Sequence, residues 1–236
     1  MIFDLANFSS QQCYYLMTQC LIPRPIAWVL TENTQPDGYN LAPFSYFTAV
    51  CSDPPILMFS IAPKANQNPT TNNTPCPKDT LDNILRTQTF VVHIAHYHQL
   101  QAVETTAKAF AYGDSELTHA NLALTDFWDS PTPDPSMPTR QSLFDRPLTN
   151  PLTSPLKRLT NTPIAFACRL YDSQIIGNQQ QTLVFGEIIN TYVADDYVTI
   201  ANNRIQVDAD AINALCRLGA GYYAAVGEPT KPQKPT

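Results

Sequence analysis

Three consecutive residues, Lys78, Asp79 and Thr80, have the types and spacing of a phosphate-binding site. They open a helical pattern, and a helix N-terminus presents free backbone N–H groups and positive potential to an anion. Lys78 would add a charge and Thr80 a hydroxyl donor. The alternative is an ordinary helix cap beside an exposed lysine, which is the commoner use of such residues. On these residues alone, the ordinary cap is the favoured interpretation.

Two hydroxyl residues, Ser45 and Thr48, interrupt the otherwise apolar run of residues 40–49. Strand alternation would allow both side chains to face solvent. The functional alternative is that their hydroxyls and the neighbouring backbone face a planar ligand that accepts and donates hydrogen bonds. The sequence does not decide between these two alternatives.

Arg24 and a pair of glycines near the C-terminus are weaker candidates. Arg24 lies between two prolines, which restrict its backbone; it could contact an anion, but a surface arginine is the simpler interpretation. Gly219 and Gly221 precede two tyrosines. They would allow a backbone to approach a ligand closely, or they would form a turn after a helix.

The histidines and the remaining motifs predict no metal site and no side-chain nucleophile. His93, His96 and His98 are close in sequence, but His93 and His96 would point to opposite faces of a strand. No carboxylate or cysteine follows at the spacing of a zinc site. The chain has no GxSxG, Walker or GxGxxG motif, each of which would indicate a known chemistry. This pattern suits an enzyme whose cofactor carries the reaction.

The composition is that of one elaborated domain with a low fraction of charged residues. The chain has 236 residues, of which 44% are hydrophobic and 14% are charged, against about 25% charged in a usual soluble protein. An oligomer that covers part of this uncharged surface is therefore plausible. The net charge of −6 argues against nucleic-acid binding, because no basic patch would release phosphate counterions. We predict a single domain over residues 1–227 and a disordered tail over residues 228–236.

The cysteines and the N-terminus indicate a cytosolic protein. The six cysteines form no CxxC pair and are expected to be free and mostly buried. The N-terminus lacks the basic and apolar regions of a signal peptide. No apolar run approaches the roughly 20 residues of a membrane helix, so we predict no membrane partner.

The element that the remaining chain must support is a pair of strands, residues 40–49 and 56–61. They are joined by Ser52-Asp53-Pro54-Pro55, where the prolines prevent a continuous strand. The other predicted elements are a helix capped by Ser9 or Ser10 and ending near residue 20, a strand over 26–30, a helix over 80–88 capped by Asp79 or Thr80 with Leu81, Ile84 and Leu85 buried, a strand over 90–95, a helix over 99–111, strands over 163–171, 182–194 and 197–200, and a short helix over 208–215. Gly186 would be a bulge.

This list of elements predicts a mainly β fold. Six to eight strands, few helices and short hairpin links favour a closed or partly closed β-barrel with peripheral short helices over βαβ units. Residues 129–155 contain seven prolines and are predicted to form a long loop. A functional lid and a disordered insertion are equally open for such a loop.

Taken in order, several segments resemble the flavin reductase-like, FMN-binding split-barrel family. They are Pro23-Arg24-Pro25-Ile26-Ala27-Trp28-Val29, Ala42-Pro43-Phe44-Ser45-Tyr46-Phe47, Ser52-Asp53-Pro54-Pro55 with Met58-Phe59-Ser60-Ile61, Lys78-Asp79-Thr80 with Asn83-Ile84, Pro163-Ile164-Ala165-Phe166-Ala167-Cys168, Val184-Phe185-Gly186-Glu187-Ile188 and Arg217-Leu218-Gly219. Each is weak alone, and the ordered set covers nearly the whole chain. The resemblance implies a Greek-key split β-barrel that forms a homodimer, with FMN near the subunit interface.

The resemblance also implies roles for particular residues. The strand containing Ser45, Tyr46, Phe47 and Thr48 would lie along the isoalloxazine ring and ribityl chain. The phosphate would be held by Ser60, Lys78, Asp79 and Thr80, with Asn83 nearby and Arg24 and Arg217 as further candidates. With the family in view, the phosphate-binding interpretation of Lys78 and Thr80 becomes the favoured one. Hydride transfer through FMN needs positioning and exclusion of water rather than a catalytic triad.

The implied activity is that of an NAD(P)H-dependent flavin reductase, an FMN-dependent oxidoreductase that passes hydride to a flavin or a small acceptor. Two alternatives stay open: a flavoredoxin-like electron carrier with a protein redox partner, and a split-barrel binding module without flavin. Two features depart from the family pattern. Trp28 replaces a small or aliphatic residue, which would alter the edge of the pocket. The loop over residues 129–155 is longer and richer in proline than expected, and would cover or reshape the substrate entrance.

Overall fold

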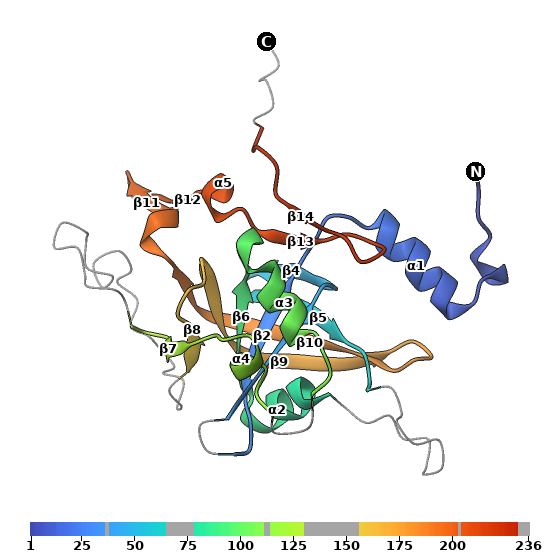
Figure 1. Cartoon of the computed structure of the whole chain (residues 1–236), viewed down its shortest axis with the longest axis horizontal. Helices are drawn as coiled ribbons and strands as arrows, with labels where there is room; N and C mark the ends of the chain where they lie inside the picture. The colour runs from blue at the N-terminus through green and yellow to red at the C-terminus, as the bar shows by residue number, and fades with distance from the viewer. Residues whose placement is uncertain (36–37, 65–77, 111–113, 130–155, 203, 231–236) are drawn as a thin grey trace.

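The computed structural model describes residues 1–35, 38–64, 78–110, 114–129, 156–202 and 204–230. Its centre is a seven-stranded antiparallel sheet in the order β3-β2-β6-β9-β10-β5-β4 (Figure 1). The strands are β2 (Ala27–Glu32), β3 (Tyr39–Phe44), β4 (Phe47–Ser52), β5 (Pro55–Ile61), β6 (Thr89–Ile94), β9 (Ile164–Ile176) and β10 (Gln181–Val193). β9 and β10 form a long hairpin that projects from the body.

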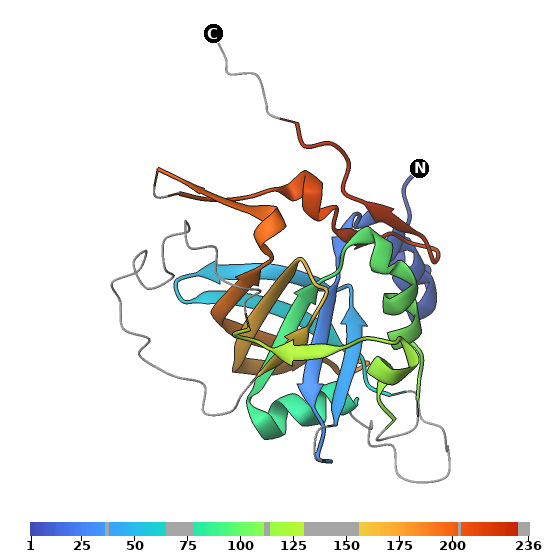
Figure 2. The same ribbon diagram turned by 60° about the vertical axis from the view of Figure 1, so that its left-hand side comes forward.

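Short helices and small sheets surround this main sheet (Figure 2). The helices are α1 (Ser10–Cys20), α2 (Asp79–Thr87), α3 (Leu100–Thr106), α4 (Glu116–His119) and α5 (Ala209–Ile212), with 3-10 turns at Leu5–Asn7, Tyr97–Gln99 and Asp195–Tyr197. The small sheets are β1 (Arg24–Pro25) with β13 (Leu215–Arg217) and β14 (Tyr223–Ala225), β7 (Leu124–Asp126) with β8 (Lys157–Leu159), and β11 (Val198–Ala201) with β12 (Arg204–Val207). No helix in the described ranges is long and apolar enough to cross a membrane.

The main sheet curls until its two ends meet. β3, at one end of the strand order, contacts β5 near the other end. Phe44 of β3 and Phe59 of β5 place their ring centroids 5.3 Å apart, within the range of a favourable aromatic pair. The chain crosses from β3 to β4 at Ser45 and Tyr46. This closure makes a barrel whose two end strands are joined by a two-residue link.

The first prediction to fail is the single strand over residues 40–49. The structure divides it into β3, which pairs with β2, and β4, which pairs with β5. The two residues at the break, Ser45 and Tyr46, are neither proline nor glycine, and Pro43 lies inside β3; the bend accompanies closure of the sheet. The strand predicted over residues 26–30 corresponds to β2, which pairs with β3. The predicted connection through Ser52-Asp53-Pro54-Pro55 between β4 and β5 is confirmed.

Helix ends were predicted with mixed success. Ser9 caps α1 with a capping box to Gln12, as predicted, and Asp208 caps α5. The predicted caps of α2 are wrong, because the N-cap residue is Lys78, which makes no side-chain capping bond. Leu85 was expected to be buried and is 46% exposed. The helix over residues 99–111 is shorter than predicted, since α3 ends at Thr106. Residues 130–155, most of the predicted loop, lie outside the described residues.

Trp28 lies in the core and not at a pocket edge. Its side chain is 0% exposed, and its Nε1 donates to Thr106 Oγ1 at 2.9 Å. An indole buried with its N–H satisfied is a packing residue. The expectation that Trp28 alters the edge of a ligand pocket is therefore corrected: the indole fills the space between β2 and α3.

The free edge of β3 is covered by the side chains of α4. Glu116 Oε2 accepts from the backbone N of Leu41 at 3.1 Å, and Ser115 Oγ donates to the carbonyl of Tyr39 at 2.9 Å. Burial raises the pKa of Glu116. These two bonds take the place of a neighbouring strand, and so they block edge-to-edge pairing at this side of the sheet.

Gly186 sits where β10 shifts register against β9, which confirms the predicted bulge. A Cβ at this position would lie 2.5 Å from Phe90 Cζ, and Phe90 is 1% exposed. Gly186→Ala should therefore lower the free energy of unfolding by about 1–3 kcal/mol through overpacking, measured by urea denaturation. Gly227→Ala is the matched control, because no atom lies within 4 Å of a Cβ added there. Equal stability of the two variants would contradict the prediction.

Candidate functional site

The link between β3 and β4 lies beside the end of β5. The backbone N of Ser60 donates to the carbonyl of Tyr46 at 2.9 Å, and Phe47 is paired with Phe59 across the two strands. Ser60 Oγ donates to Gln181 Oε1 at 3.2 Å. The structure thus brings together Ser45, Tyr46, Phe47 and Ser60, four residues for which the family resemblance implies contact with the flavin.

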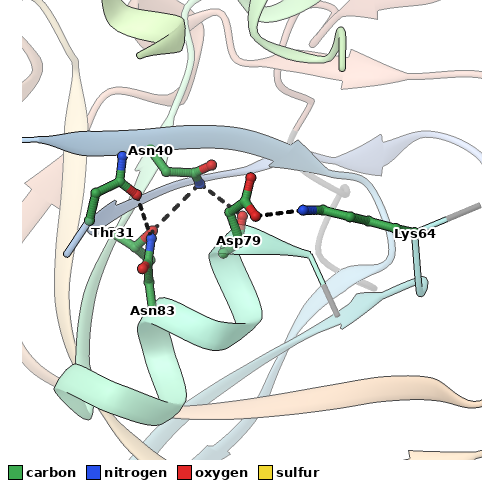
Figure 3. Close-up of polar contacts among 7 residues, drawn as sticks. Thr31, Asn40, Lys64, Asp79 and Asn83 are labelled. Carbon is green, nitrogen blue, oxygen red and sulfur yellow. Dashed lines mark hydrogen bonds and ion pairs between the residues drawn. The ribbon is translucent and has the colours of Figure 1, made fainter. Parts of the chain in front are cut away.

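The N-terminus of α2 meets the same end of the barrel (Figure 3). Lys78 Nζ lies 5.7 Å from the ring centroid of Phe44, the last residue of β3. Lys64, just after β5, forms an ion pair with Asp79 at 2.6 Å. Two lysines are therefore gathered at the first turn of a nine-residue helix, and Lys78 lies near the ring of Phe44, the residue before Ser45.

Lys78 is an unneutralised cation at this helix start. In the part of the chain that the structure describes, its ammonium has no hydrogen bond and no ion pair. Burial lowers the pKa of Lys78, and the nearby charge of Lys64 lowers it further. The first N–H groups of a helix also have no intrahelical partner. A bound anion would relieve the repulsion between the two lysines and use these free donors.

Thr80 and Asn83 point into the protein rather than toward this anion site. Thr80 Oγ1 accepts from Asn40 Nδ2 at 2.9 Å. Asn83 Nδ2 donates to Thr31 Oγ1 at 3.1 Å and to Asn33 Oδ1 at 2.8 Å, as Figure 3 shows in part. Both side chains are at least 98% buried, so their network holds α2 on the β2–β3 hairpin. For Thr80, the group left to face a phosphate is its backbone N–H.

Arg24 holds the end of α1. Its guanidinium donates to the carbonyls of Thr18, Leu21 at 2.7 Å and Leu218 at 3.0 Å. A cation is favoured at a helix C-terminus, so these bonds account for most of the donors of Arg24. Its Nε is buried without a partner, as is Tyr46 Oη. Burial raises the pKa of Tyr46, with Tyr14 adding to the rise and Arg24 opposing it.

Arg217 and Thr48 are not brought to the lysines. Arg217 Nη1 donates to Glu104 Oε1 at 3.0 Å, and its guanidinium carbon lies 4.2 Å from the ring centroid of Tyr223, whose hydroxyl also bonds Glu104. Burial and Glu104 raise the pKa of Tyr223 to about 12. Thr48 is exposed on β4, and its hydroxyl donates to the carbonyl of Ala49 at 3.2 Å. The flavin contacts of Arg217 and Thr48 stay predictions.

The histidines form no metal site among the described residues, where no group of three or more ligating side chains occurs. His93 is 0% exposed and is bonded at both ring nitrogens: Nδ1 lies 3.0 Å from the carbonyl of Trp28, and Nε2 accepts from the backbone N of Leu159 at 3.1 Å. His96 Nδ1 accepts from the backbone N of His98 at 3.0 Å. Five cysteines in these ranges are free.

Sequence reasoning missed two residues of the site, Lys64 and Gln181. Neither residue belongs to the segments that carry the family resemblance. The signal for Lys64 was a lysine directly after a buried strand, with an acidic residue opening the next helix. Nothing local marked Gln181, whose contact with Ser60 depends on the pairing of β10 with β5.

Comparison with known proteins shows which family model and which solved structures the chain resembles. The family model for the flavin reductase like domain matches residues 18–206. Nitrilotriacetate monooxygenase component B from Bacillus cereus superimposes with a TM-score of 0.76 and 23% identity, covering 98% of each chain. The 2-nitrobenzoate 2-nitroreductase NbaA of Pseudomonas fluorescens gives 0.75 and 25%, covering 100% of this chain and 97% of its own.

A third structure identifies the fold. A flavin reductase with a split barrel domain from Shewanella frigidimarina gives a TM-score of 0.71 and 15% identity, covering 100% of both chains. The predicted mainly β architecture, a Greek-key split β-barrel with peripheral short helices, is confirmed. The chain belongs to the flavin reductase-like family of split-barrel proteins.

Proposed function

We propose that this protein is an FMN-binding oxidoreductase, an NAD(P)H-dependent flavin reductase that passes hydride to a flavin or a small acceptor. The observation that carries the cofactor assignment is Lys78, a partly buried and unneutralised lysine at the start of α2, beside Lys64 and the Ser45–Phe47 link. Family membership supports flavin-related oxidoreduction. The expected homodimer and cytosolic location are part of the same proposal.

The residues present fit FMN. Lys78, Lys64 and the backbone N–H groups of Asp79 and Thr80 would hold its phosphate. The carboxylate of Asp79 would repel a phosphate, and its ion pair with Lys64 offsets that charge. When bound, FMN supplies hydride transfer at its isoalloxazine ring. The chain would bind the phosphate, orient the ring and exclude water from it.

The ring would lie along the link between β3 and β4. Ser45 and Phe47 are half-buried there, and the backbone bond from Ser60 to Tyr46 fixes the path of the link. Fixed backbone groups suit a planar ligand, because they lose little freedom on binding. This geometry gives the Ser45–Phe47 segment an orienting role that needs no side-chain nucleophile.

The names of two relatives in structure suggest the type of acceptor. One is a nitroreductase acting on 2-nitrobenzoate, and the other is component B of a monooxygenase. We propose on this analogy that the acceptor is either a small aromatic compound or a free flavin. The site would then have to admit a second planar molecule beside the flavin ring.

The test is the visible absorbance spectrum of the purified protein, followed by NADH or NADPH without air. Flavin bands that bleach on addition of either nucleotide are the expected result. Bands that persist until a protein donor is added would favour an electron carrier over a reductase. A colourless protein that does not take up added FMN would contradict the cofactor assignment, while the split-barrel fold would stand.

A further inference from the structure

A buried network of uncharged polar side chains lies between α2 and the β2–β3 hairpin (Figure 3). Its members, each at most 8% exposed, are Thr31, Asn33, Asn40, Thr80 and Asn83. Asn40 Nδ2 donates to Thr80 Oγ1 at 2.9 Å and to Thr31 Oγ1 at 3.5 Å. Asn83 Nδ2 donates to the same Thr31 hydroxyl and to Asn33. The five side chains therefore form one connected set of hydrogen bonds.

Stability alone does not account for this network. A buried hydrogen bond adds only modest net stability, and replacing both partners by apolar groups of the same shape can be nearly neutral. Two of the four buried residues of α2, Leu81 and Ile84, already pack into an apolar core cluster. A fully bonded polar network adds a defined geometry, because its bonds are satisfied at one rotation and one position of the helix. The network thus specifies where α2 lies on the hairpin.

β3 supports both parts of the proposed flavin site. Near its start, Asn40 bonds Thr80 in the first turn of α2. At its end, Phe44 lies under Lys78, whose Nζ is 5.7 Å from the ring centroid. The link that would carry the flavin ring follows directly at Ser45. The position of the phosphate site relative to the ring site therefore depends on how the start of α2 is held on β3.

The other end of α2 is held by different contacts. Arg86, in the last turn, donates to the carbonyl of Glu32 and, at 3.3 Å, to Asn83 Oδ1. Ile84 is 0% exposed and fixes the middle of the helix in the core. Loss of the bond between Asn40 and Thr80 would therefore release the first turn without detaching the helix.

We propose that Asn40 is a positioning residue that makes the site select a flavin carrying a phosphate. Its bond to Thr80 holds the first backbone N–H groups of α2, and the neighbouring ammonium of Lys78, at a fixed place relative to the ring segment. A helix start that could shift would bind phosphate less tightly, because it would have to be ordered on binding. The inference rests on the FMN site of the proposed function and adds a residue that would not touch the cofactor.

Apolar replacement of both bonding partners tests the proposal. The Asn40→Leu, Thr80→Val double variant removes donor and acceptor together, so its unfolding in urea should change little. The ratio of the riboflavin to the FMN dissociation constant, measured by flavin fluorescence titration, should fall about tenfold. Thr87→Val is the matched control. It removes a bonded hydroxyl from the last turn of the same helix and should leave the ratio unchanged.

Thr80→Val and Thr80→Ser form a second pair, which decides the question if the double variant does not fold. Serine keeps the hydroxyl that Asn40 bonds, so Thr80→Ser should retain the wild-type ratio while Thr80→Val lowers it. An unchanged ratio in the valine variants, whether both affinities hold or both fall in parallel, would overturn the inference and leave the FMN site standing. A wild type that does not prefer FMN to riboflavin would overturn the phosphate site of the proposed function, and this inference with it.

Discussion

Replacing His93 with leucine is expected to lower the free energy of unfolding at pH 7 by about 2–4 kcal/mol. The imidazole is fully buried and joins β6 to two other strands, through the carbonyl of Trp28 and the backbone N of Leu159. Leucine would leave these two groups without their partner, at about 1–3 kcal/mol for each group that stays unsatisfied. Urea denaturation would measure the loss, and His98→Leu, at an exposed position, is the control.

The same side chain should make the protein sensitive to acid. Burial lowers the pKa of His93 from 6.5 to about 4, and the charge of Arg158 also lowers it, while the bond to Trp28 opposes the shift. The unfolded chain then binds a proton at higher pH than the folded one. The contribution of neutral His93 is complete above pH 6.5 and is lost as the pH falls through about 4, which amounts to about 3 kcal/mol.

The pH dependence separates this mechanism from simple loss of packing. Leucine cannot titrate, so the difference in stability between wild type and His93→Leu should shrink between pH 6.5 and pH 4. A packing effect alone would give the same difference at both pH values. A constant difference would therefore show that burial does not hold His93 neutral.

The helices and strands of this fold could be predicted from the sequence where a local signal marked their ends. Prolines marked the connection between β4 and β5, and Ser9 with Gln12 marked the start of α1. The break at Ser45 and Tyr46 had no such signal, because the bend comes from closure of the sheet. The same holds for Trp28, whose burial depends on packing against α3 through Thr106. Local chemistry predicts where elements end, and long-range packing decides how they bend.

The residues of the candidate site were also predicted only in part. Lys78 and the link at Ser45–Phe47 were found from residue type and motif, and the structure brings them together. Asn83 was assigned to the ligand, yet its amide bonds the β2–β3 hairpin, since its position on α2 faces the sheet. Lys64 was missed because its ion pair with Asp79 spans 15 residues. Side-chain direction, rather than residue type, accounts for these differences.

The second large effect is expected at Lys78. Lys78→Ala should weaken FMN binding about 10- to 100-fold, because it removes a charge-assisted hydrogen bond of roughly 1.5–3 kcal/mol to the phosphate. Flavin fluorescence titration would measure the change. Lys108→Ala, which removes an exposed lysine elsewhere, is the control. Thr80→Ala is a poorer probe. The Thr80 hydroxyl accepts a hydrogen bond from Asn40, and its loss would disturb the packing of α2 on the β2–β3 hairpin.

Riboflavin, which lacks the phosphate, separates a direct contact from a change of fold. If Lys78 binds the phosphate, Lys78→Ala should weaken FMN and leave riboflavin affinity unchanged. Equal losses for both ligands would mean that Lys78 supports the ring site, next to Phe44, and not the phosphate. Unchanged affinity for both ligands would contradict the assignment of the phosphate to the start of α2. Added salt screens the attraction between charges near the surface, so a direct contact between Lys78 and the phosphate should make FMN binding weaken with salt more in the wild type than in the variant.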